Sequence, residues 1–79
     1  MNKYQLLKNN EDTIYQFVKN GILSYQIIRD ISIFEDFNKL ESHSNIKNVE
    51  VRYSLIGDEY ELSSKRIEQI ILQMQKDII

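Results

Sequence analysis

The chain has 79 residues, of which 10 are Lys or Arg and 12 are Asp or Glu, so its formal charge is −2. So short a chain forms one domain and buries only roughly 60–65% of the surface that it exposes when unfolded, so a partner subunit would add stability. The absence of cysteine excludes disulfides and thiolate metal sites and permits a reducing compartment. The acidic balance is the opposite of that expected for a protein held mainly by phosphate contacts.

Apolar residues never form a run long enough for a secretory signal or a membrane span. We therefore expect a soluble, cytoplasmic protein with no membrane partner. Isoleucine, lysine and asparagine are frequent and proline is absent, which indicates an AT-rich coding sequence and hence a bacterium, its phage or its plasmid.

The first helix is predicted after Asn10, whose side chain can cap free amides while Glu11 and Asp12 favour the positive end of the helix dipole. Asn20 and Gly21 are expected to end it, because glycine suits a left-handed cap. Residues 2–8 fit either an extra helical turn or a loose arm.

A second, longer helix is predicted from a cap at Ser24 to about Ser42. Three apolar residues at helical spacing form its buried stripe: Ile27, Ile31 and Phe34. Three more lie to one side of that stripe: Ile33, Phe37 and Leu40. Together they make an apolar face wider than one neighbouring helix covers, so the second set is predicted to form a homodimer interface.

Residues 41–45 are polar and indicate a turn. Beyond it, apolar side chains recur at steps of three and four, which favours a third helix: Ile46, Val49, Tyr53, Ile56 and Tyr60. The alternation and β-branching of residues 49–53 would also suit a short strand. The helix is the preferred interpretation because its period continues to Tyr60.

The last helix is predicted to start at a cap on Ser63, with Leu62 packing against Ile67 as a hydrophobic staple. Its expected buried face contains Ile67, Ile70, Ile71, Met74 and Ile78. The expected fold class is therefore all-α, a single four-helix domain over residues 1–79.

Residues 56–70 read Ile-Gly-Asp-Glu-Tyr-Glu-Leu-Ser-Ser-Lys-Arg-Ile-Glu-Gln-Ile, and their apolar and small positions have the spacing of a helix-turn-helix. Gly57 is small where two steeply crossing helices must approach closely, and Leu62 fills the turn. Ile67 and Ile70 anchor the second helix. The domain is expected to end in this motif, at about residues 47–77.

Residues 53–75 resemble the helix-turn-helix of bacterial sigma factors in their promoter −35-binding region and the terminal motif of small phage and plasmid regulators. The resemblance implies DNA binding by the last helix. Glu61 departs from the pattern, because the family commonly has glycine at this turn position, so the backbone there is expected to be less left-handed or mildly strained.

The predicted DNA-binding residues lie opposite or beside the buried face centred on Ile67: Ser64, Lys65, Arg66, Gln69, Gln73 and Lys76. By resemblance, the first four are where such modules contact bases or phosphates, with glutamine suited to adenine and lysine or arginine to guanine or phosphate. An ordinary solvated helix face has the same composition.

Nothing in the sequence predicts catalysis, a cofactor or a metal. His43 is the one histidine and is expected in a solvated turn. With glycine only at positions 21 and 57, no phosphate-binding or dinucleotide loop can form. Most aromatic residues have spacing or neighbours that favour a core over stacking on single-stranded bases: Tyr15, Phe17, Phe34, Tyr53 and Tyr60.

The sequence thus predicts a DNA-binding transcriptional regulator or accessory factor whose last helix enters the major groove of double-stranded DNA. The few basic residues predict weak binding per monomer, and hence a homodimer on two half-sites. The alternative is a protein-interaction module of a mobile element that binds a host protein through an acidic helical surface.

Overall fold

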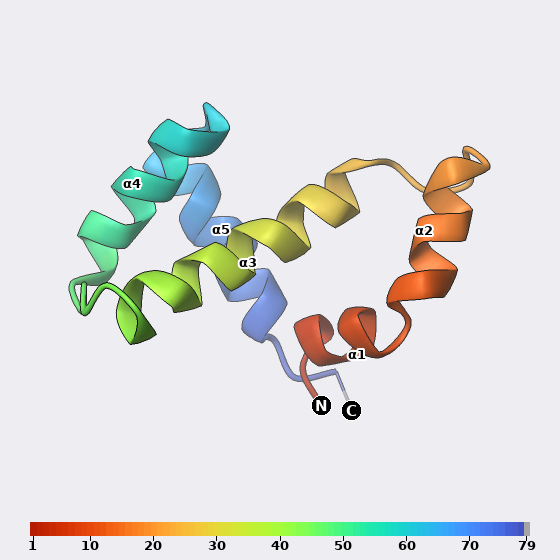
Figure 1. Cartoon of the computed structure of the whole chain (residues 1–79), viewed down its shortest axis with the longest axis horizontal. Coiled ribbons are helices and arrows are strands. Elements are labelled where there is room, and N and C mark those ends of the chain that lie inside the picture. The colour runs from red at the N-terminus through yellow and green to blue at the C-terminus, as the bar shows by residue number, and fades with distance from the viewer. Residues whose placement is uncertain (79) are drawn as a thin grey trace.

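The computed structural model describes residues 1–78 and is all-helical, with no strand in that range (Figure 1). The helices are α1 (Lys3–Asn9), α2 (Glu11–Lys19), α3 (Gln26–Ser42), α4 (Val49–Tyr60) and α5 (Ser64–Gln75). The all-α prediction is confirmed. The number of helices is five rather than four, because residues that fitted either a turn or an arm form α1.

A capping box at the amino terminus explains α1. The Asn2 side chain accepts a hydrogen bond from the Gln5 amide at 2.8 Å, and the Gln5 side chain accepts one from the Asn2 amide at 2.9 Å. Each satisfies a free donor at the start of the helix. These residues are spaced like the Ser/Thr-x-x-Glu/Gln pattern, with asparagine in place of the hydroxyl residue.

The start of α2 differs in detail from the expectation. Asn10 makes no side-chain cap there, and its side-chain Nδ2 instead donates to the Leu6 carbonyl at 2.8 Å, at the end of α1. The acids Glu11 and Asp12 lie in the first turn as expected. Gly21 has a φ of 75°, which confirms the left-handed residue after α2.

Of the remaining predicted caps, Ser63 is confirmed, since its side chain accepts from the Arg66 amide at 3.1 Å at the start of α5. Ser24 accepts from the Gln26 amide at 3.2 Å, but the N-cap of α3 is Tyr25, which makes no side-chain cap, so the prediction for Ser24 differs by one residue. Asn48 accepts from the Val51 amide at 3.1 Å, so α4 begins at Val49 rather than near Ile46. The strand alternative for residues 49–53 is wrong, because they form the first turns of α4.

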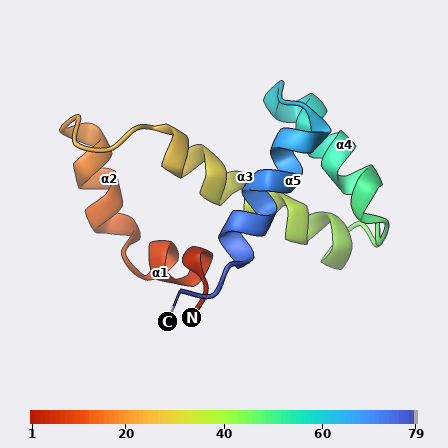
Figure 2. The same cartoon turned by 180° about the vertical axis from the view of Figure 1, so that it is seen from behind.

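The core lies where α3 crosses α4 and α5 (Figures 1 and 2). Tyr4 and Leu7 of α1 pack against its edge. Its buried members come from these three helices: Ile31, Ile33, Phe34, Phe37, Tyr53, Ile56, Ile67, Ile70, Ile71 and Met74. The predicted buried face of α5 is confirmed except at Ile78, which lies beyond the helix and is exposed.

The proposed dimer face of α3 is occupied within one chain. Ile33 is 0% exposed and Phe37 4% exposed, and the partly buried Leu40 packs against the same core. The face is wide because α1, α4 and α5 all contact α3. Ile33, Phe37 and Leu40 therefore pack inside one chain, and the apolar face that predicted self-association is not an uncovered surface.

Helix α2 stands apart from this core at one side of the molecule (Figures 1 and 2). Ile14 is its one buried residue. Tyr15 and Phe17, which were expected in the core, are 52% and 41% exposed. That expectation was wrong because an amphipathic pattern shows which side chains share a face, not how closely a neighbour covers it.

The chain ends are held together beside α1. The Met1 ammonium lies 3.1 Å from an Asp77 carboxylate oxygen, the Lys3 amide donates to the Lys76 carbonyl, and the Ile78 amide donates to the Met1 carbonyl. These contacts place the segment after α5 against the first residues of α1, as Figure 2 shows.

Candidate nucleic-acid interface

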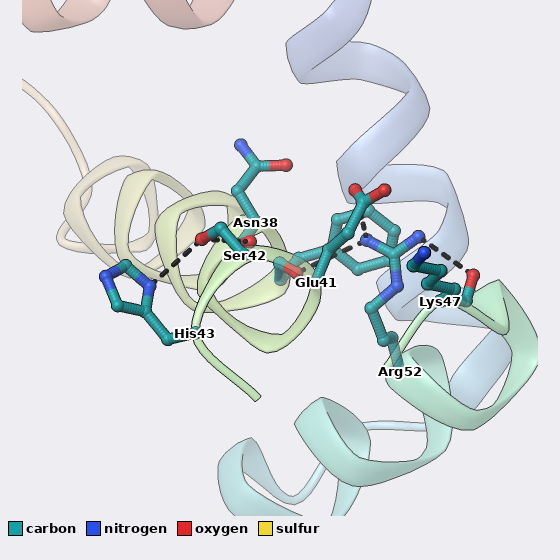
Figure 3. Close-up of polar contacts among 7 residues, drawn as sticks. Asn38, Glu41, Ser42, His43, Lys47 and Arg52 are labelled. Atoms are coloured by element: carbon teal, nitrogen blue, oxygen red, sulfur yellow. Dashed lines mark hydrogen bonds and ion pairs between the residues drawn. The ribbon is translucent and has the colours of Figure 1, made fainter. Parts of the chain in front are cut away.

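A buried arginine joins the end of α3 to the start of α4. Arg52 is 4% exposed, and its guanidinium lies 4.1 Å from the centroid of the Phe37 ring. It donates to the carbonyls of Phe37 and Lys47, each at 3.4 Å, and lies 3.5 Å from Glu41 (Figure 3). The cation thus connects the Phe37 carbonyl of α3 with the Lys47 carbonyl just before α4, and its contact with the Phe37 ring holds α4 against α3.

The turn between α4 and α5 consists of residues 61–63. Glu61 is left-handed, with φ 57° and ψ 42°, so of the two expected alternatives the structure has the strained left-handed backbone rather than a less left-handed one. The Leu62 amide donates to the Gly57 carbonyl at 2.9 Å. A Cβ atom on Gly57 would lie 2.6 Å from the Leu62 carbonyl oxygen, so the turn folds back onto α4 at the one residue without a side chain.

All six predicted DNA-binding residues are exposed. Five lie on α5, whose opposite face is buried at Ile67, where the exposed fraction is 0%. Lys76 differs from the expectation, because α5 ends at Gln75 and Lys76 has extended backbone. Its carbonyl accepts from the Lys3 amide, so this lysine is fixed at the carboxyl end of the exposed face.

The charge on this face is mixed. The Lys65 ammonium donates to the Glu68 carboxylate at 3.1 Å, one turn further along α5. Both residues line an open groove with Glu50 and Tyr53 of α4 and with Ser64. The carboxylates of Glu50 and Glu68 therefore lie beside the amino-terminal end of α5.

Leu72 is a surface residue that the sequence reasoning missed. It is 55% exposed and follows Lys65 by two helical turns on α5. Its position seven residues after Lys65 was visible in the sequence. Unlike the other apolar residues of α5, it lies off the buried face, so the helical period that marks the core does not include it.

A second group of charged residues joins α1, α2 and α3. Tyr4 donates to Glu35 at 2.7 Å, and Lys8 lies 2.7 Å from Glu11 and 3.1 Å from Glu35. Burial alone would raise the pKa of the Glu35 carboxyl, but the hydrogen bonds from Tyr4 and Lys8 outweigh it and lower that pKa. Lys8, Glu11 and Glu35 line a cavity of about 150 Å³ together with Ile14 and Tyr15.

Metal-binding groups do not cluster in the described part of the chain, where no three His, Asp or Glu side chains meet as a metal site would require. His43 is exposed after α3, and its Nδ1 lies 2.9 Å from the Ser42 hydroxyl (Figure 3). Tyr53 and Tyr60 are used in packing: Tyr53 stacks on Phe37 at 5.4 Å between centroids, and Tyr60 donates to Asp36 at 2.6 Å.

Comparison of the chain with protein-family models, with curated proteins and with solved structures gave no match. Among residues 1–78, no helix is both long and apolar enough to span a membrane.

Proposed function

We propose that the chain is a sequence-specific DNA-binding protein, a transcriptional regulator or accessory factor in which α5 enters the major groove. The observation that carries the proposal is the contact between Gly57 and Leu62, together with the left-handed Glu61. This short turn joins two packed helices and leaves one whole side of the second helix uncovered. That arrangement is how a helix-turn-helix presents its reading helix.

The exposed side chains of α5 suit distinct contacts. Ser64, Lys65 and Arg66 lie in its first turn, the end that contacts base edges in such modules. Gln69 and Gln73 can each pair with adenine through two hydrogen bonds. Lys76 follows the helix and suits a phosphate, and Leu72 can pack against a thymine methyl group.

Electrostatics set the expected strength of binding. Lys65 is paired with Glu68, and the net charge is −2, so one copy neutralises few phosphates. Affinity falls with salt by a slope of about −0.9 per phosphate contact, so two or three contacts give weak binding and a shallow slope. A homodimer on two half-sites raises the affinity by adding a second α5.

The test is an electrophoretic mobility shift assay with a pool of genomic fragments from an AT-rich bacterium, at low and moderate salt. The variant Lys65→Ala/Arg66→Ala/Gln69→Ala is expected to lose binding. A matched control, Lys39→Ala/Lys47→Ala/Gln26→Ala, removes the same charge from exposed positions outside α5 and is expected to bind like the wild type. Equal loss in both triple variants, or no shift of the wild type at low salt, would refute the proposal.

A second candidate is a mobile-element module that binds a host protein. Two features favour it: the carboxylates of Glu50 and Glu68 beside α5, and the exposed apolar residues Leu72, Val51 and Leu55. Exposed apolar side chains rimmed by charge are typical of protein interfaces. Under this alternative Leu72→Ser abolishes capture of the host protein, while the wild type leaves DNA unshifted.

A further inference from the structure

Helix α2 is the outermost element on its side of the molecule, and in both views no other element lies beyond it (Figures 1 and 2). Its inner face holds the buried Ile14, and its residues Asp12, Tyr15, Gln16 and Lys19 are exposed. Asp12 and Lys19 are separated by seven residues, so they lie on one edge of the helix about 10 Å apart.

Within residues 1–78, neither Asp12 nor Lys19 takes part in a salt bridge, whereas the neighbouring Glu11 pairs with Lys8. The edge of α2 therefore carries a negative charge near its amino end and a positive charge near its carboxyl end, with Tyr15 and Gln16 between them.

We infer that two copies of this chain associate through α2, side by side and antiparallel about a two-fold axis near Tyr15 and Gln16. In this arrangement Asp12 of each copy faces Lys19 of the other, so both ion pairs form at once. The opposed helix dipoles also attract. A parallel pair would place Asp12 against Asp12 and Lys19 against Lys19, which opposes association.

Apolar residues near α2 contribute to the same contact. Tyr15 is 52% exposed, and its ring can cover the aliphatic part of the opposing Lys19. Ile22 follows the Lys19 end of the helix and is 66% exposed. Antiparallel pairing brings that end next to the junction of α1 and α2 in the other copy, which removes apolar surface from water.

The interface is small, because α2 has only nine residues. It belongs to the weak, transient class rather than to the large apolar interfaces of obligate dimers. The association is therefore measured by sedimentation velocity and light scattering at protein concentrations from about 10 µM to about 1 mM.

The decisive experiment uses two charge reversals, Asp12→Lys and Lys19→Glu, each studied alone and then mixed. In a homodimer of either variant, like charges face each other at both ends of the interface. The dimer dissociation constant of each variant alone is therefore expected to be about tenfold higher than that of the wild type. Mixed in equal amounts, the two variants make both pairs attractive again, so a heterodimer of wild-type affinity is expected. The mixture also shows that both variants are folded, since a misfolded copy could not restore binding.

Glu59→Lys is the matched control for Asp12→Lys, because it also replaces an acidic residue by lysine, at an exposed position of α4. It is expected to leave the dissociation constant unchanged. A wild type that stays monomeric throughout the concentration range, or reversals that do not complement each other, would overturn the inference. The measurement contains no DNA, so failure of this dimer is distinct from failure of the proposed DNA binding.

Discussion

The carbonyl oxygen of Leu62 occupies the space that a side chain on Gly57 would need, at 2.6 Å from the ideal Cβ position. Because the contact is with backbone, no rotamer change can relieve it. The close approach of α4 and its turn sets the direction in which α5 leaves, and so the orientation of the proposed DNA-binding face.

Gly57→Ala is expected to lower the free energy of unfolding by about 2 kcal/mol, because the steric strain exceeds the gain of about 1 kcal/mol in helix propensity. Urea unfolding followed by circular dichroism measures this change. Ser54→Ala, at an exposed position of the same helix, is the control and is expected to be neutral or stabilising. A Gly57→Ala protein as stable as the wild type would show that the turn can move to accommodate the Cβ atom without a loss of stability.

Glu61→Gly is expected to stabilise the protein by about 0.5–1 kcal/mol. Glu61 has a φ of 57°, and a left-handed residue other than glycine costs about 1 kcal/mol. Glu59→Gly removes the same charge two positions earlier, inside α4, and is expected to destabilise by about 1 kcal/mol. Thermal melts of both variants should therefore shift in opposite directions, and a shared direction would contradict the left-handed assignment.

Arg52→Ala is expected to cost about 3 kcal/mol of stability, because it removes the contact with the Phe37 ring and the bonds to two carbonyls. Arg52→Met should cost less. Methionine fills the same space without a charge, and it removes the buried Arg52 Nε, which has no hydrogen-bond partner among the described residues.

Chemical denaturation of these two variants, with Arg66→Ala as an exposed control, measures the difference. The control should lie within about 0.5 kcal/mol of the wild type. If Arg52→Met proved as damaging as Arg52→Ala, the charge itself, rather than the volume of the side chain, would be what α3 and α4 require.

Tyr60 links the pH dependence of stability to the contact with Asp36. Burial raises the pKa of the Tyr60 hydroxyl, and the hydrogen bond to Asp36 raises it further. The folded-state pKa therefore lies above the unfolded value of about 10. The stabilisation is fully present below about pH 10 and is lost as the pH rises above that value.

Tyr60→Phe is accordingly expected to cost about 1 kcal/mol at neutral pH and to flatten the loss of stability above about pH 10. Urea midpoints at neutral and alkaline pH test this, with Tyr15→Phe as the control for an exposed phenol. Parallel pH profiles for wild type and Tyr60→Phe would exclude a contribution from this hydroxyl. Tyr4 and Tyr53, whose pKa values are also raised, are present in both proteins and cancel in the comparison.

Local signals predicted the elements well because they act within a few residues. The periodicity from Val49 to Tyr60 selected a helix over a strand, and Ser63 capped α5 as its position indicated. Asn10 was misassigned because its side chain can serve either of two adjoining helices, and it donates to the earlier one. The position of Leu72 on α5 was also available from its spacing.

Packing between distant residues could not be predicted in the same way. The apolar width of α3 was correctly recognised, but the sequence does not say whether a second chain or α4 and α5 cover Phe37. The burial of Arg52, 15 residues after Phe37, gives no sequence signal either, because arginine is usually exposed.

By itself, the sequence determined an all-helical chain, the cap of α5 at Ser63, and the close Gly57 and Leu62 turn, because propensity, capping and periodicity are local properties of the backbone. Only the tertiary structure decided that the apolar face of α3 is filled within one chain and that α2 stands outside the core, with Asp12 and Lys19 in no salt bridge among residues 1–78. Those features depend on which apolar surfaces pack against each other, and this is determined only by the arrangement of all five described helices.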